Sequence, residues 1–135
     1  MSTRREVIGL LGGAAAWPGM AQAQQPGVPV VGLLRSTPSA SFEHIVAALR
    51  RGLADAGFVE GRNVVVEQRW AEGRDDRLPA LLADLVDRKA AVIVANSVGA
   101  LAAKAAGTTV PVVFTTGSDP VRDGLVASLN RPGAN

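Results

Sequence analysis

Residues 91–115 read AVIVANSVGALAAKAAGTTVPVVFT, a short apolar run, an alanine-rich stretch and a second short apolar run. The runs at Ala91–Ala95 and Val110–Thr115 have the length and composition of buried strands, and Ser97–Ala106 between them is predicted to be a helix. A strand, a helix and a strand in this order require a right-handed crossover between two parallel strands. The stretch therefore predicts an α/β fold.

The same alternation begins further upstream. Val28–Leu34 is a continuous apolar run, which predicts a strand that is buried on both faces. Ser41–Ala56 has its apolar residues at helical spacing, and Gly57 follows it as a helix stop. These two segments predict an earlier strand and helix of the same sheet.

A further strand and helix are expected in between. Asn63–Trp70 alternates apolar and polar residues, which favours a strand at the edge of a sheet. The helix after it is expected to run to about Lys89, with Asp75 or Asp76 as its N-cap, and a last helical turn is expected at Pro120–Gly124. The whole pattern predicts a flavodoxin-like, doubly wound parallel sheet with strand order 2-1-3-4 and helices on both faces.

Length and composition limit the class of protein. The chain has 135 residues, which suits one domain. Its net charge is +2 with acidic and basic residues interleaved, and aromatic residues make up 4% with no tyrosine. Because neither a basic stripe nor a stacking platform is present, nucleic-acid binding is not expected. The sequence has no cysteine, so we expect no disulfide, no thiolate metal site and no lipid-anchor cysteine.

The N-terminal segment has the pattern of an export signal. Arg4 and Arg5 precede the apolar stretch Val7–Trp17, which is too short to span a membrane as a helix. Ala21 and Ala23 are the small residues at alternate positions that a signal peptidase accepts, so cleavage is expected after Ala23. The paired arginines resemble a twin-arginine signal, and the general secretion route is the alternative.

The candidate binding residues follow the predicted strands. In a doubly wound sheet the ligand lies outside the carboxyl ends of the strands, at the point where the strand order reverses. The loops at those ends are rich in hydroxyl and amide groups, and they contain the candidates Ser36, Thr37, Asn96, Ser97, Thr116, Gly117, Ser118 and Asp119. Ser97 is expected to cap its helix, and the free N–H groups beside it suit an anionic group of a ligand. Capping alone is the alternative interpretation for each of these polar residues.

Several other chemistries lack their residues. No dinucleotide fingerprint and no P-loop motif is present, so no nucleotide cofactor is expected. The adjacent Asp75 and Asp76 suit a helix start better than a metal site, and His44, the sole histidine, is expected at the surface. We therefore predict no catalytic residue, no cofactor and no metal. Trp70 either reaches the rim of the binding site or closes the edge of the core.

Four segments also carry a resemblance to a known family. They are residues 52–63 (GLADAGFVEGRN), 69–73 (RWAEG), 77–81 (RLPAL) and 119–133 (DPVRDGLVASLNRPG). They closely resemble the ABC transporter substrate-binding family that is related to tryptophan- and tyrosine-binding lipoproteins. The resemblance implies a type I periplasmic-binding-protein fold, in which two flavodoxin-like lobes close on a solute without catalysis.

On this resemblance the chain is the N-terminal lobe of such a protein, and the candidate loops form half of its binding site. The expected division is a signal peptide at 1–23, a linker at 24–27, a lobe at 28–129 and the start of a hinge at 130–135. The implied function is periplasmic binding of a small solute, possibly an amino acid, for an ABC permease in the inner membrane. The alternatives are a small flavodoxin-like enzyme and a non-functional gene fragment, whose mark would be an uncovered apolar face.

Overall fold

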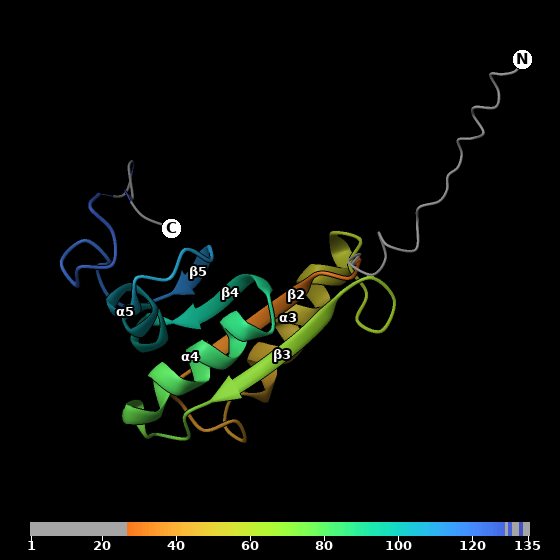
Figure 1. Cartoon of the computed structure of the whole chain (residues 1–135), viewed down its shortest axis with the longest axis horizontal. Coiled ribbons are helices and arrows are strands. Elements are labelled where there is room, and N and C mark those ends of the chain that lie inside the picture. Colours follow the sequence, from red (N-terminus) through yellow and green to blue (C-terminus); the bar gives the residue numbers. More distant parts are fainter. Residues whose placement is uncertain (1–26, 129, 131–132, 134–135) are drawn as a thin grey trace, which may run out of the picture.

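The computed structural model describes residues 27–128, 130 and 133 and contains a four-stranded parallel sheet in the order β3-β2-β4-β5 (Figure 1). Numbered along the chain, these strands lie in the order 2-1-3-4, so the predicted flavodoxin-like topology is confirmed. The elements are β2 (Val30–Arg35), α3 (Glu43–Asp55), β3 (Val65–Trp70), the 3₁₀ turn η1 (Asp75–Arg77), α4 (Leu78–Asp87), β4 (Ala90–Asn96), α5 (Ser97–Ala106) and β5 (Val112–Thr115).

The central place of β2 explains its apolar sequence. β2 pairs with β3 on one side and with β4 on the other, and all of its residues after Val30 are buried. A strand covered on both faces needs apolar side chains on both, as its continuous run predicted. β3 lies at an edge, which is the place that its alternating sequence indicated.

The two faces of the sheet are covered to different extents. α4 and α5 pack on one face, where Leu34 and Ile93 form a core with Leu85. α3 lies on the other face (Figure 1), and Val46 is its one buried residue. Val113 on β5 belongs to this second face through the strand register and is 57% exposed. The α3 side of β5 is therefore left uncovered by the described part of the chain, whereas Val112 and Phe114 on its other side pack against the core.

The predicted aspartate cap of α4 is wrong. Asp75 and Asp76 lie in η1, where the Arg77 amide donates to the Arg74 carbonyl oxygen at 3.0 Å. This bond tightens the segment into a 3₁₀ turn, and α4 begins after it, at Leu78, without a side-chain cap. The two carboxylates therefore lie too early in the chain to reach the first amides of the helix.

One element near the C-terminal end, the strand β5, is shorter than predicted. β5 begins at Val112 rather than Val110 because Pro111 has no N–H to give to the ladder. The Pro111 carbonyl oxygen still accepts from the Ile93 amide at 2.9 Å, so the strand is already in register there. Residues 120–124 form a single turn in which the Asp123 amide donates to the Asp119 carbonyl oxygen at 2.9 Å, the i to i+4 bond of a helical turn, as predicted.

The predicted signal peptide, with Arg4, Arg5, Ala21 and Ala23, lies outside the described residues. The same holds for the expected linker apart from Gly27 and for most of the hinge expected at 130–135. Across residues 27–128, no helix combines the length and the apolar character that crossing a membrane requires.

Candidate functional site

The carboxyl ends of β2 and β4 are joined through one asparagine. The Asn96 Nδ2 group donates to Ser36 Oγ at 2.8 Å, and the Ser36 amide donates to Asn96 Oδ1 at 3.3 Å. β2 and β4 are neighbours in the sheet although Ser36 and Asn96 are far apart in the sequence. The structure thus brings together two of the predicted site residues at the switch point, where an α/β sheet binds its ligands.

Asn96, and not Ser97, is the N-cap of α5. Its Oδ1 accepts from the Gly99 amide at 3.1 Å, and its backbone is extended, with φ −81° and ψ 175°. Ser97 is the first helical residue, and its side chain makes no hydrogen bond within the described residues. The expected cap is therefore wrong by one residue, because a serine inside the first turn cannot fold back onto the amides that an N-cap serves.

Gly99 brings the start of α5 against the backbone of β2. A Cβ atom at this position would lie 2.8 Å from the Leu34 carbonyl oxygen and 3.1 Å from Asn96 Oδ1. Sequence reasoning missed this residue. The only signal in the sequence is a glycine in the first turn of a helix, where glycine is otherwise unfavourable.

Thr37 lies beside a buried arginine that sequence reasoning also left out of the site. Arg35 is the last residue of β2 and is 7% exposed, and its Nε lies 3.4 Å from Thr37 Oγ1. Its guanidinium carbon lies 4.9 Å from the centre of the Phe42 ring. Burial lowers the pKa of the Arg35 guanidinium below its ordinary value. A charged residue at the end of an apolar strand was the signal that could have identified it.

The loop after β5 forms a separate network. Thr116 Oγ1 and Ser118 Oγ lie 3.0 Å apart, and Ser118 also donates to the Asp123 carboxylate. Asp119 Oδ1 accepts from the Val121 amide at 2.9 Å, which supports the turn that follows. No hydrogen bond within the described residues connects this loop, including the exposed Gly117, to the Ser36–Asn96 pair.

The loop after β3 holds the rim in place. Glu72 Oε2 accepts from Ser39 Oγ at 3.0 Å, and the Gly73 amide donates to the Ser36 carbonyl oxygen at 2.7 Å. Trp70 is half-buried, and its Nε1 donates along its own strand to Gln68 Oε1 at 3.1 Å. The backbone around Ser36 is therefore fixed from both sides, by Asn96 and by the loop after β3.

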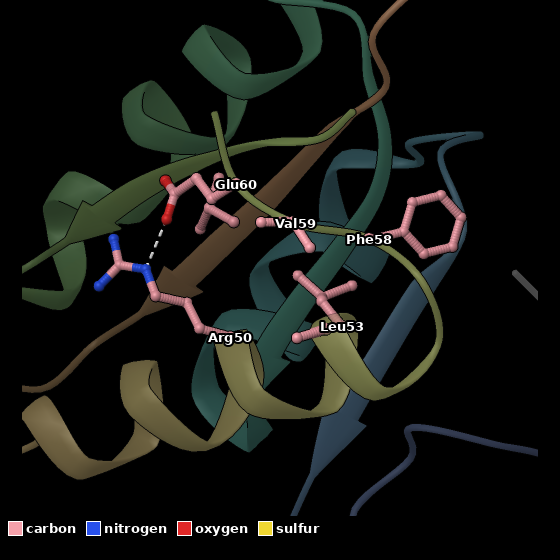
Figure 2. Close-up of a pocket in the computed structure, with 7 residues that line it drawn as sticks. Arg50, Leu53, Phe58, Val59 and Glu60 are labelled. Carbon is pink, nitrogen blue, oxygen red and sulfur yellow. Dashed lines mark hydrogen bonds and ion pairs between the residues drawn. The ribbon is translucent and has the colours of Figure 1, made fainter. Parts of the chain in front are cut away.

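A hollow of about 260 Å³ lies elsewhere, between α3 and the segment that leads into β3 (Figure 2). Leu53, Phe58 and Val59 give it an apolar lining. Its charged groups are already paired, since Arg50 Nε lies 2.6 Å from Glu60 Oε1. Because this hollow lies toward the amino ends of the strands and its two charged side chains neutralise each other, we place the candidate site at the carboxyl edge.

The groups at that edge are suited to binding a ligand. Hydroxyl, amide and guanidinium groups and the first amides of α5 can hold a polar or anionic group. His44 is exposed and stacks on the Phe42 ring, with 5.8 Å between the ring centres. Across the described ranges, no group of three or more His, Cys, Asp or Glu residues is placed to hold a metal ion.

The sequence matches the family model described as ABC transporter substrate binding protein over residues 31–135. A curated relative, the "Tyrosine-binding protein" of Clostridioides difficile (strain R20291), is 26% identical over 106 residues. That alignment covers 78% of this chain and 31% of the relative. This chain thus spans about a third of the length of the curated relative that it matches.

Three solved structures are similar in fold. A conserved domain protein of Vibrio cholerae matches with a TM-score of 0.72 and 27% identity, over 80% of this chain and 37% of its own. The ABC domain in complex with L-Trp from Streptococcus pneumonia matches with a TM-score of 0.71 and 24% identity, over 80% of this chain and 37% of its own. A ligand-free, open substrate-binding protein with adhesive properties from Clostridium difficile matches with a TM-score of 0.70 and 24% identity, over 79% of this chain and 37% of its own. Each of these matches covers about four fifths of this chain and 37% of the larger chain.

Proposed function

The chain belongs to the ABC transporter substrate-binding protein family, and from that premise we propose that it binds a small solute for an ABC uptake transporter. The family is one of binding proteins and not of enzymes. The proposed site is the carboxyl edge of the sheet, with Ser36, Thr37, Asn96 and Ser97 at its centre. Thr116, Gly117, Ser118 and Asp119 form its margin.

The observation that carries this proposal is the junction of Ser36, Asn96 and the start of α5. Asn96 uses both ends of its amide to fix Ser36 and the Gly99 amide, so the polar groups of two loops are held rigid before any ligand arrives. Rigid polar groups lose little conformational entropy when they bind, which favours affinity. The other amides in the first turn of α5 face the same edge of the sheet and suit an anionic group.

The proposed solute is an amino acid. The curated relative is a tyrosine-binding protein, and one similar structure holds L-Trp. An amino acid carries a carboxylate, which suits the helix start and the polar rim described above. Tyrosine and tryptophan are therefore the first solutes to test.

We further propose that the protein is exported to the periplasm and delivers its solute to a permease in the inner membrane. Arg4, Arg5, Ala21 and Ala23 support an export signal at residues 1–23 by their spacing in the sequence. Cell fractionation of the intact chain and of an R4K/R5K variant tests this step. The intact chain is expected in the periplasmic fraction, and the variant is expected to stay in the cytoplasm if the twin-arginine route is used.

Thermal unfolding of the full chain with a panel of amino acids tests the binding proposal. A ligand that binds only the native state raises the unfolding midpoint, by an amount that corresponds to about 2.7 kcal/mol when the ligand is at one hundred times its Kd. We expect a rise with L-tyrosine or L-tryptophan. A cooperative transition that no amino acid shifts would contradict the proposal.

Two asparagine variants show whether the carboxyl edge is responsible for the rise. N96A removes the junction of β2, β4 and α5, and we expect it to lose the rise caused by the ligand. N63A is the matched control, because Asn63 also makes two hydrogen bonds to backbone groups, with the Val59 amide and the Gly57 carbonyl oxygen, but ahead of β3. Both variants are expected to lower the midpoint without ligand, at about 1 kcal/mol per lost hydrogen bond. An equal ligand response in both would place the site elsewhere.

A further inference from the structure

Arg35 is a buried cation at the carboxyl edge of the sheet. It ends β2, directly before Ser36, and is 7% exposed. Its guanidinium contacts Thr37 and the ring of Phe42, which both belong to the segment that follows β2. The charged group therefore lies under the edge loop, next to the proposed site, and not within the core between the sheet and α4.

No carboxylate neutralises this charge in the part of the chain that the structure describes. Arg50, Arg69 and Arg88 are all more exposed, yet each lies within 4.0 Å of an aspartate or glutamate. The Arg35 side chain makes one hydrogen bond among the described residues, from Nε to Thr37 Oγ1, and at 3.4 Å it is long. A guanidinium has five N–H donors, and buried polar groups are nearly always satisfied. The terminal nitrogens of Arg35 therefore have donors to offer.

The surroundings of Arg35 suit an incoming anion. Ser36 follows it in the chain, and Asn96 ties Ser36 to the start of α5. The first amides of that helix carry a partial positive charge. A guanidinium binds a carboxylate through two parallel N–H···O bonds, which a lysine cannot do. Burial lowers the pKa of the Arg35 guanidinium, and a carboxylate bound beside it would act in the opposite direction.

We propose that Arg35 binds the carboxylate of the solute and so restricts the site to solutes that carry one. This inference rests on the proposed function and adds to it the residue that selects the class of solute. A purely structural role is the competing explanation, in which the stacking of Arg35 on Phe42 merely holds the loop. The two explanations differ in one respect, since only the first makes binding depend on the carboxylate of the ligand.

The test compares L-tryptophan with tryptamine, which lacks the carboxylate, by calorimetric titration of the full chain. The wild type is expected to prefer L-tryptophan by roughly 10- to 100-fold, the range of a charged hydrogen-bonded contact. R35Q is expected to lose most of this preference, because only the first amides of α5 remain to favour the carboxylate. R35K keeps the charge without the planar fork, so it is expected to retain a part of the preference. Indole-3-propionate, which has the carboxylate without the amine, is expected to follow L-tryptophan in its dependence on Arg35.

R50Q is the matched control, because Arg50 is an arginine on α3 whose charge is paired with Glu60. We expect R50Q to keep the wild-type preference. If R35Q kept that preference, or if the wild type bound L-tryptophan and tryptamine equally, the inference on Arg35 would be wrong and the binding proposal would stand. If the wild type bound no amino acid at all, both would be wrong. Thermal unfolding without ligand shows whether R35Q is folded, and R35K serves in its place if it is not.

Discussion

At the scale of single residues, the candidate site depends on a close approach of α5 to β2. Asn96 caps the helix and holds Ser36, and Gly99 leaves room for the Leu34 carbonyl oxygen. A side chain at Gly99 would push the helix start away from the strand. The polar groups at the edge are thus positioned by packing as well as by hydrogen bonds.

Replacing Gly99 by alanine is expected to lower the unfolding midpoint. Alanine favours a helix interior over glycine by about 1 kcal/mol, so propensity alone predicts a rise. At Gly99 the new Cβ would lie 2.8 Å from a backbone oxygen, and overpacking of this kind costs about 1–3 kcal/mol. We expect a net fall of several degrees, measured by thermal unfolding followed by circular dichroism.

G52A is the control for this substitution. Gly52 lies within α3, and a Cβ atom there would meet nothing within 4 Å. The midpoint is therefore expected to rise in G52A and to fall in G99A. A rise in both variants would show that α5 does not approach β2 closely.

At the scale of elements, the two faces of the sheet differ in how far helices cover them. α4 and α5 together cover one face, whereas α3 is the one described helix on the other. Val31 and Val113 both belong to the α3 face, through the register of β2 with β4 and of β4 with β5. Val31 is 6% exposed and Val113 is 57% exposed. The packing on this face therefore protects the centre of the sheet and does not extend to the edge strand β5.

Truncating these two valines is expected to have unequal effects. V31A removes buried methyl groups from the centre of the sheet and is expected to cost about 2 kcal/mol in the free energy of unfolding. V113A removes the same groups from a largely exposed position and is expected to cost less than about 1 kcal/mol. Chemical denaturation of both variants measures the difference. Equal losses would mean that Val113 is covered in solution.

The alternation of apolar runs predicted the topology of the sheet. The apolar sequence of β2 indicated its central place, and the mixed sequence of β3 indicated an edge. The helix at Ser97–Ala106 has the predicted bounds. The borders of other elements moved because turn hydrogen bonds, such as the one that closes η1, and the missing N–H of Pro111 act on single residues that periodicity does not resolve.

The hydrogen bonds of the candidate site were predictable only in part. The switch-point rule selected the loops, and the structure joins Ser36 to Asn96 as that rule implies. The N-cap of α5 is Asn96 instead of Ser97, because Asn96 is the last residue with an extended backbone before the helix begins. Arg35 and Gly99 were missed because burial and close approach arise from the packing of distant segments.

At the scale of the whole molecule, the described sheet corresponds to a part of larger relatives. The matches cover 31% of the curated relative and 37% of each solved structure. The proposed binding site lies at the carboxyl edge of this sheet. That edge carries a capped helix start, hydroxyl groups and Arg35, which has no carboxylate partner among the described residues. The hollow lined by Phe58 carries Arg50, which is paired with Glu60.

The measurement that tests this claim most directly is a titration of the isotope-labelled chain with L-tryptophan, followed through its backbone amide NMR signals. We predict that the largest shifts fall on residues 35–37 and 96–99, at the carboxyl ends of β2 and β4, and that residues 57–60 beside the hollow stay unchanged. Shifts concentrated at residues 57–60, or no shift at any ligand concentration, would contradict the assignment of the site.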